Sequence, residues 1–142
     1  MNFLKGTGVA IITPFKKSGE IDFDAYKLLI EYYVKNNISY LVILGTTGES
    51  HTITLKEKNK ILENVVEFNR GRLPLVVGVG GNDTQGLVNQ ILNYDLKNFS
   101  AILTVCPYYN KPTQAGLYEH FYHVSKASTI PIILYDVPSR TG

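Results

Sequence analysis

Short apolar runs recur along this chain, and the segments between them have the apolar spacing of amphipathic helices. Five such runs lie at residues 8–13, 40–44, 74–79, 101–105 and 130–135. Runs of this length and composition are typical of strands that are buried on both faces of a parallel sheet. Strand, loop and helix return about every thirty residues, which is the length of a βα unit. The sequence therefore predicts an α/β fold with an all-parallel sheet and helices outside it.

The segments between the runs carry recognisable helix boundaries. Asp22 is expected to cap the first helix, and the pair Thr54 and Glu57 forms a capping box that begins the second. Arg70 and Gly71 are expected to end the second helix. The positions expected to face the core in the four helices are Phe23, Tyr26, Leu29, Ile30, Tyr33 and Val34; Leu55, Ile61, Leu62, Val65, Val66 and Phe68; Leu87, Val88, Ile91, Leu92 and Leu96; and Leu117, Phe121 and Val124.

The loops that follow the strands are expected to meet on one rim, because right-handed crossovers bring the carboxyl ends of parallel strands together. The loop GTTGES at residues 45–50 is the most informative of them. Gly45 and Gly48 permit conformations in which backbone N–H groups converge on an anion, and Thr46 and Thr47 add two hydroxyls. The alternative is a tight turn in which the threonines act as local caps. The other polar residues expected on the rim are Asn82, Tyr108, Tyr109 and residues 135–140.

Two architectures agree with a repeated βα unit: a doubly wound open sheet and a (β/α)₈ barrel that is cut short. A nucleotide-binding open sheet would carry a GxGxxG motif or a P-loop after a strand. Neither GTTGES nor GVGGND matches those templates. A closed barrel needs about 250 residues, so five strands correspond to little more than half of one.

Composition excludes several classes of protein. The chain has 142 residues, 44% of them hydrophobic and 18% charged, with a formal net charge of +2, which indicates one soluble globular domain. A single cysteine, Cys106, rules out a disulfide framework and fits a reducing cytoplasm. No basic run, membrane span or secretory signal is present, so we expect neither a nucleic-acid nor a membrane partner. No cofactor is expected, and no metal-binding spacing is formed by His51, His120 and His123.

Three motifs together resemble the dihydrodipicolinate synthase / N-acetylneuraminate lyase family of (β/α)₈ Schiff-base aldolases. They are GTTGES at residues 45–50, PYYNKP at 107–112 and LYDVPSRTG at 134–142. The resemblance covers essentially the whole chain, and it implies that residues 1–142 are the N-terminal part of a single TIM-barrel domain, with about five of the eight strands. The dihydrodipicolinate synthase branch is the more similar one, because the sialic acid lyases lack an arginine at the position of Arg140. That branch is a lyase that condenses pyruvate with aspartate 4-semialdehyde on the route to lysine and diaminopimelate.

The resemblance implies two substrate-binding groups. Thr47, together with the backbone of Gly45 and Gly48, would hold the carboxylate of pyruvate. Arg140 would bind the carboxylate of the aldehyde substrate through a forked, charge-assisted contact. An isolated arginine at this place in a sequence is more often a solvated surface charge, so the assignment depends on the motif around it.

The resemblance also implies a proton relay of hydroxyl groups. Thr46 and Tyr135 would belong to one subunit, and Tyr109 would reach in from a neighbouring subunit of a homodimer or homotetramer. Hydroxyls in a line can pass a proton without any of them ionising, which suits groups with a high intrinsic pKa. Taken alone, Tyr135 at the end of a strand would more often be a core residue.

The lysine that forms the imine in this family lies at the end of the sixth strand, beyond Gly142. Lys111 is in a loop, and the other lysines are expected on loops or helix surfaces, so none is expected to replace it. We therefore expect residues 1–142 to belong to a longer enzyme and to lack Schiff-base catalysis by themselves. Two alternatives remain: an N-acetylneuraminate or 2-keto-3-deoxy sugar acid aldolase of the same family, and a non-catalytic half-barrel that associates through its unpaired strand edges.

Regulation by lysine is expected to be weak or absent. Feedback-inhibited members of the family bind lysine at a dimer interface through a histidine and a glutamate, and Lys58 and Gly86 stand at those two positions here. The residues that could still line this cavity are Ser50, His51, Asn82 and Tyr108.

Overall fold

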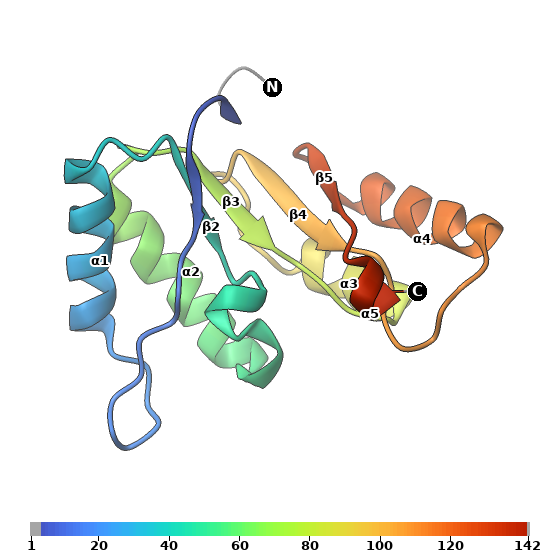
Figure 1. The fold of residues 1–142 in the computed structure, drawn as a ribbon, viewed down its shortest axis with the longest axis horizontal. Helices are drawn as coiled ribbons and strands as arrows, with labels where there is room; N and C mark the ends of the chain where they lie inside the picture. The colour runs from blue at the N-terminus through green and yellow to red at the C-terminus, as the bar shows by residue number, and fades with distance from the viewer. Residues whose placement is uncertain (1–3, 142) are drawn as a thin grey trace. The chain divides into compact units, whose positions relative to one another are not determined.

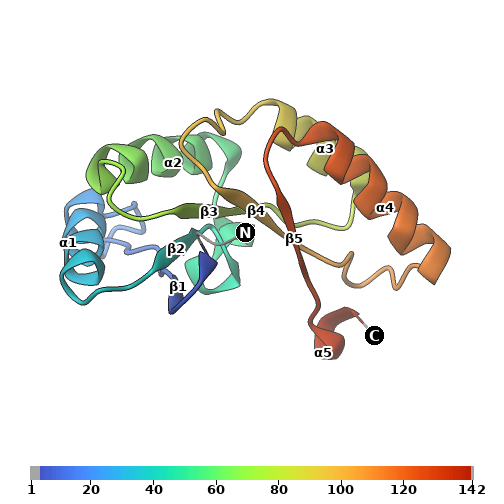
Figure 2. The same cartoon turned by 90° about the horizontal axis from the view of Figure 1, so that it is seen from above.

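The computed structural model describes residues 4–141, so Gly142 at the end of the third motif lies outside the described residues. The chain forms two compact units, Met1–Val76 and Val77–Gly142, and the boundary falls within the strand β3 (Leu75–Gly78). Each unit combines parallel strands with helices that run side by side (Figures 1 and 2). The predicted α/β class with five parallel strands is confirmed.

The first unit contains the strand pair that leads into the GTTGES loop. Its elements are β1 (Gly8–Ala10), α1 (Phe23–Lys35), β2 (Tyr40–Ile43), the short 3₁₀ turns η2 (Thr46–Gly48) and η3 (Ser50–Thr52), and α2 (Leu55–Asn69). β1 and β2 are parallel, with Gly8 opposite Tyr40, and β3 follows β2 in the strand order. All four residues of β3 are buried, as the continuous apolar run predicts.

Helix boundaries in this unit follow the sequence signals. The Asp22 side chain accepts a hydrogen bond from the N–H of Ala25, and Thr54 and Glu57 form the predicted capping box. Arg70 ends α2 in the left-handed conformation, with φ 50°, and Gly71 follows with φ 69°. These signals act over three or four residues, which is why the sequence alone reveals them.

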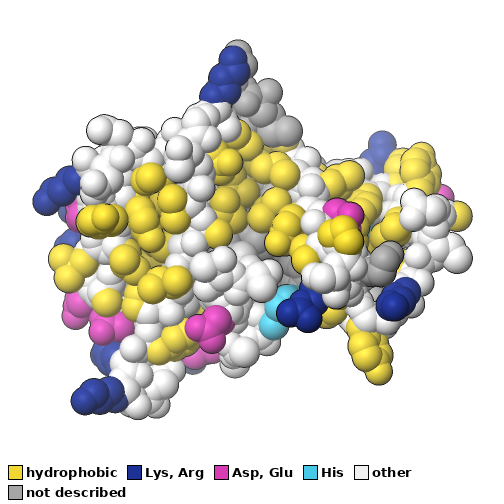
Figure 3. All heavy atoms as spheres, viewed as in Figure 1, with side chains coloured by type: hydrophobic (Ala, Val, Ile, Leu, Met, Phe, Trp, Pro, Cys, Tyr) yellow, Lys and Arg dark blue, Asp and Glu magenta, His cyan; other side chains and the backbone are white. Residues whose placement is uncertain are grey.

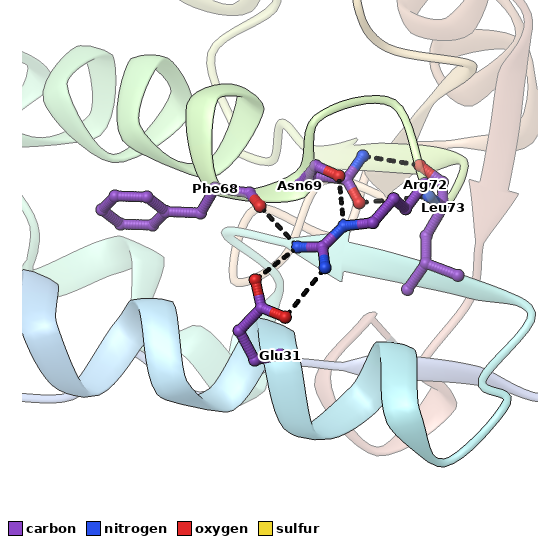
Figure 4. A network of polar contacts seen from close by, with 5 residues as sticks. All are labelled: Glu31, Phe68, Asn69, Arg72 and Leu73. Carbon is purple, nitrogen blue, oxygen red and sulfur yellow. Dashed lines mark hydrogen bonds and ion pairs between the residues drawn. The ribbon is translucent and has the colours of Figure 1, made fainter.

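A polar network joins the end of α2 to α1 (Figure 4). The Asn69 side chain donates to the carbonyl of Leu73 at 2.8 Å and accepts from its N–H at 3.1 Å, so one amide closes the connection into β3. The Arg72 guanidinium donates to the carbonyls of Asn69 and Phe68 and forms two hydrogen bonds, of 2.8 and 2.6 Å, with the Glu31 carboxylate. The Arg72 hydrogen bond lowers the pKa of Glu31 below its usual value.

The second unit repeats the arrangement. Its elements after β3 are α3 (Thr84–Leu92), β4 (Ala101–Val105), α4 (Gln114–Ala127), β5 (Ile132–Tyr135) and the single turn α5 (Pro138–Thr141), which the sequence does not predict. β4 and β5 are parallel, with Ile102 opposite Ile132. Asp83 and Thr113 cap α3 and α4 through their side chains.

The helix stripes are confirmed at their centres and fail at their ends. Tyr26, Ile30, Ile61, Leu87 and Val124 are buried, but Leu55 is 53% exposed and Leu92 is 66% exposed. Leu55 and Leu92 are the first residue of α2 and the last residue of α3, and Leu96, which was expected on the third helix, is buried but lies beyond the end of α3. The stripe period therefore identifies the buried face and overestimates its length.

Exposed hydrophobic side chains remain on α1, where Leu28 and Tyr32 point away from the core. In Figure 3 such side chains gather in patches over the α1 side of the view. Within residues 4–141 no helix combines the length and the apolar character that a membrane span requires.

Candidate active-site loops

The loop after β2 has its unusual backbone conformations at non-glycine residues. Leu44 and Glu49 are left-handed, with φ of 59° and 54°. Gly45 is extended, with φ −71° and ψ −178°, and Gly48 does not have a positive φ either. Neither glycine of this loop therefore uses the left-handed region that is open mainly to glycine, and the reason for a glycine at position 48 lies in its packing.

Gly48 is small because the end of β1 approaches it closely. A Cβ atom at this position would lie 3.1 Å from the carbonyl oxygen of Ile11 and 3.4 Å from Oγ1 of Thr13. The Thr13 hydroxyl, which is buried, donates a 2.7 Å hydrogen bond to the Gly48 carbonyl. Burial anchors the loop again at Leu44 and Ile53. The back of the loop is thus packed into the core of the first unit.

Two of the N–H groups expected to face an anion are used inside the loop. The N–H of Gly48 donates to the carbonyl of Gly45, and that of Glu49 donates to the carbonyl of Thr46, both at 3.0 Å. In the part of the chain that the structure describes, the N–H groups of Thr46 and Thr47 donate to no other group. The side chains of both threonines are exposed. The N–H groups of Thr46 and Thr47 are therefore available as donors, whereas the N–H of Gly48 is not.

Ser50 and His51, which were predicted to line a regulatory cavity, follow on the same loop in η3. Burial, and then the charge of Lys58, lower the pKa of His51 below its usual value. The ring is therefore held mainly in its neutral form near pH 7. Within residues 4–141 no cluster of three or more His, Cys, Asp or Glu side chains could hold a metal ion.

In the second unit, the loop after β4 presents the PYYNKP motif. Tyr109 is 88% exposed, and both Tyr109 and Lys111 are left-handed, with φ of 69° and 46°. The Asn82 side chain donates to the carbonyl of Tyr108 at 3.4 Å, and the Asn110 side chain donates to the carbonyl of Asn82 at 3.3 Å. Asn82 and Tyr108, two of the predicted regulatory residues, are thus brought together.

Tyr135 is the last residue of β5, and Arg140 lies on the short helix α5 that follows. Tyr135 is 37% exposed and lines a cavity of about 340 Å³ with Cys106 and Asp136. Burial, and next the Asp136 carboxylate, raise the pKa of the Cys106 thiol, so this cysteine is held as a neutral thiol and is a poor nucleophile. Arg140 lies exposed on α5, where the bond from the Thr141 hydroxyl to Asp136, 2.9 Å long, ties the turn together.

A buried histidine between α3 and α4 was not predicted. His120 of α4 is 3% exposed, and its Nδ1 lies 2.8 Å from the hydroxyl of Thr84, the first residue of α3. Among the described residues its Nε2 has no hydrogen-bond partner, and burial lowers the pKa of the ring below its usual value. The signal that could have revealed it is its place one turn before Val124 on the apolar face of α4.

The predicted site residues therefore form two groups. Gly45, Thr46, Thr47 and Gly48 share one loop of the first unit, while the second unit carries Tyr109 in the loop after β4, Tyr135 at the end of β5 and Arg140 on α5. The relay of Thr46, Tyr109 and Tyr135 draws on both units and stays a prediction. The functional groups of these predicted site residues are hydroxyls, backbone N–H donors and one guanidinium.

Comparison with known proteins decides which family combines these features. The family model of the dihydrodipicolinate synthetase family matches residues 3–142. The chain belongs to that family. The motifs GTTGES, PYYNKP and LYDVPSRTG thus lie in a chain of the predicted family, and the TIM-barrel type of fold is confirmed for its five strands.

Individual synthases are similar to this chain over nearly its whole length. The 4-hydroxy-tetrahydrodipicolinate synthase of Azobacteroides pseudotrichonymphae genomovar. CFP2 is 50% identical over 139 residues, which are 98% of this chain and 47% of the relative. The crystal structure of dihydrodipicolinate synthase from Aquifex aeolicus has a TM-score of 0.90 at 46% identity and covers 96% of this chain and 46% of that one. A chloride-inhibited dihydrodipicolinate synthase from Acinetobacter baumannii, complexed with pyruvate, has a TM-score of 0.92 at 36% identity, with 96% and 47% covered. This dihydrodipicolinate synthetase family chain spans about half the length of the relatives it matches.

Proposed function

We propose that the protein is a cytoplasmic Schiff-base lyase that condenses pyruvate with L-aspartate 4-semialdehyde in the biosynthesis of lysine and diaminopimelate. The observation that carries the proposal is the match to the dihydrodipicolinate synthetase family over residues 3–142, with the three motifs at the carboxyl ends of strands β2, β4 and β5. The relative from Azobacteroides bears the name of this activity, and the Acinetobacter enzyme was crystallised with pyruvate.

In this reaction the ketone of pyruvate condenses with a lysine amine, and water leaves to give an imine. Loss of a proton from the methyl group gives an enamine, whose carbon attacks the aldehyde. We assign the carboxylate of pyruvate to the Thr46–Thr47 segment, where two N–H groups and two exposed hydroxyls are available as donors. Thr46, Tyr135 and Tyr109 move the protons, and Arg140 binds the carboxylate of the aldehyde substrate.

We place the imine-forming lysine outside residues 1–142. Lys111 is exposed in a left-handed loop position and not at a buried strand end. Burial lowers the pKa of Lys58, but this residue lies in the first turn of α2, not at a strand end. Residues 1–142 alone are therefore expected to be inactive, while supplying most of the groups that bind and protonate the substrates.

Imine trapping tests the proposal. The product of the native gene is incubated with pyruvate and borohydride, and its intact mass is compared with that of the polypeptide of residues 1–142 treated in the same way. We expect the native product to gain one reduced pyruvyl group and the polypeptide of residues 1–142 to gain none. A native product that gains no adduct at saturating pyruvate would overturn the proposed function.

Arg140→Ala separates the proposed substrate from the alternative aldehydes. For the synthase, this variant should still form the imine with pyruvate and lose the use of aspartate 4-semialdehyde, because the second carboxylate has no binding partner. For an N-acetylneuraminate or 2-keto-3-deoxy sugar acid aldolase, the corresponding sugar substrates should be cleaved by the unchanged protein. Activity on those sugars and none on the semialdehyde would transfer the assignment to that branch.

Oligomer formation belongs to the same proposal. Tyr109 is 88% exposed, so it can join a buried relay only if another surface covers it, and we assign that surface to a neighbouring subunit of a dimer or tetramer. With Lys58 and Gly86 at the two positions named above, millimolar lysine is expected to leave activity unchanged. Strong inhibition by lysine would contradict that assignment.

A further inference from the structure

We propose that Thr13 is a positioning residue for the carboxylate of the keto acid, although it lies outside the GTTGES loop. This inference rests on the proposed function, because it concerns the loop assigned to pyruvate. Thr13 follows β1, and its buried hydroxyl donates a 2.7 Å hydrogen bond to the carbonyl of Gly48. Its effect on the Thr47 donor passes through two peptide groups.

The first peptide group joins Gly48 to Glu49. Its carbonyl accepts from the Thr13 hydroxyl, and its N–H donates to the carbonyl of Thr46 at 3.0 Å. A peptide group is planar, with its C=O and N–H pointing in opposite directions. Two hydrogen bonds at its two ends therefore fix the rotation of this plane.

The second peptide group joins Thr46 to Thr47. Its carbonyl points at the N–H of Glu49, so its own N–H, which belongs to Thr47, must point the opposite way. The same reasoning holds one residue earlier, because the Gly45 carbonyl accepts from Gly48 and so directs the N–H of Thr46. The Thr13 hydroxyl thus sits at the start of a chain of contacts that ends at the Thr47 donor.

The surroundings of Thr13 leave the loop little freedom to take another position. Gly48 is buried, and even a single added carbon would come within 3.1 Å of the Ile11 carbonyl. Tyr26 is fully buried, and its phenol has a pKa that burial raises and the Thr13 hydroxyl lowers in part. Without the Thr13 hydroxyl, the Gly48 carbonyl would be buried with no donor from Thr13, and the loop would gain by turning it toward water.

Thr13→Val removes the hydroxyl while keeping the shape of the side chain. In the native gene product we expect about a tenfold rise in the KM for pyruvate, and in the pyruvate concentration that half-saturates imine trapping, since misdirected donors bind the carboxylate less well. The KM for the aldehyde should not change. Thr13→Ser should restore both pyruvate constants, because it keeps the donor.

Thr52→Val is the matched control. Thr52 lies on the same loop, and its hydroxyl donates to the Glu49 carbonyl at 2.9 Å, a group outside the chain of contacts that leads to Thr47. We expect this variant to leave the KM for pyruvate within about twofold of the unchanged protein. Thr13→Ala is measured beside Thr13→Val, so that a folding defect in one variant does not decide the result.

The outcomes separate this inference from the proposed function. If the unchanged protein forms no imine, the proposed function fails whatever Thr13 does. If it forms the imine and folded Thr13→Val or Thr13→Ala shows the same pyruvate dependence, the positioning role is wrong. Equal rises in both KM values, or an equal effect from Thr52→Val, would likewise contradict it, because a general loss of structure would not select pyruvate.

Discussion

The loops after β2 and after β4 both carry predicted site residues, and they are held in different ways. The loop after β2 has buried anchors at Leu44, Gly48 and Ile53, and a buried hydroxyl bonds to its back. The loop after β4 has one buried residue, Pro107, and is otherwise held by backbone and amide contacts of 2.8 to 3.4 Å, and its Tyr109 side chain is almost fully exposed.

This difference indicates which functional groups of each loop are held in position by the chain itself. The donors of the first loop are directed by the core behind them, so they are preorganised before any substrate arrives. Nothing in the described part of the second unit fixes the Tyr109 ring, so its position depends on whatever surface covers it. Four substitutions or titrations test this contrast, beginning with the largest expected effect.

Tyr109→Phe should separate activity from stability. Because the side chain is 88% exposed, its free energy of unfolding should change by no more than about 0.5 kcal/mol. If Tyr109 completes a proton relay, kcat should fall about a hundredfold in the native gene product. Steady-state kinetics and a urea titration check the two expectations, and a variant with unchanged kcat would remove Tyr109 from the relay.

Gly48→Ala should destabilise the first loop, because its Cβ would meet the Ile11 carbonyl at 3.1 Å. Overpacking of this kind costs about 1–3 kcal/mol of unfolding free energy. Gly45→Ala is the control, since its Cβ would lie 3.8 Å from Val42, an ordinary contact, and φ is −71°. The control should change stability by less than about 0.5 kcal/mol. Equal losses in the two variants, measured by urea unfolding, would mean that Gly48 is not a close-approach position.

Acid should weaken the second unit through His120. Burial lowers the pKa of the folded ring, whereas the unfolded ring keeps a value of about 6.5. The unfolded state therefore binds the proton first as the pH falls below about 6.5, and stability drops by at most about 1.4 kcal/mol per pH unit until the folded pKa is reached. Above pH 6.5 this contribution is constant.

The free energy of unfolding, measured by urea titration from pH 7.5 to 5, checks this dependence of stability on pH. His120→Gln should flatten it, while His123→Gln, on an exposed position of the same helix, should not. His51 also has a lowered pKa and adds a slope of the same sign from the first unit, so His51→Gln is measured in parallel. A slope that survives in His120→Gln would show that another group is responsible.

Tyr26→Phe should have the smallest effect. The Tyr26 hydroxyl is fully buried and meets no hydrogen-bond partner among the described residues. Removing an unpaired buried hydroxyl should leave stability unchanged or raise it by up to about 1 kcal/mol. A loss of more than about 1 kcal/mol on urea unfolding would indicate a hydrogen bond to Thr13, which would extend the support of the first loop by one residue.

The features that the sequence predicts correctly depend on near neighbours in the chain. The caps at Asp22 and Thr54 and the stop at Arg70 and Gly71 are contacts within one helical turn. Strand positions follow from apolar runs in the same way, so the α/β class could be predicted. The motifs then identify the family because they occur together in order.

The supports of the site could not be predicted, because they join residues far apart in the chain. Thr13 and Gly48 are separated by 35 positions, and Thr84 and His120 by 36. No local pattern shows that Gly48 is needed for a close approach and not for its backbone freedom. Likewise, the period of α4 places His120 on the apolar face but gives no partner for its imidazole.

The packing of the first loop has a consequence for how such a site can diverge. The buried residues of this loop are Leu44, Gly48 and Ile53, whereas the side chains at positions 46 and 47 face solvent. Exchanging those two side chains would therefore alter what the loop recognises with little effect on whether the protein folds. Natural variation or protein design can therefore change the ligand specificity at these two positions without a compensating stabilising mutation elsewhere.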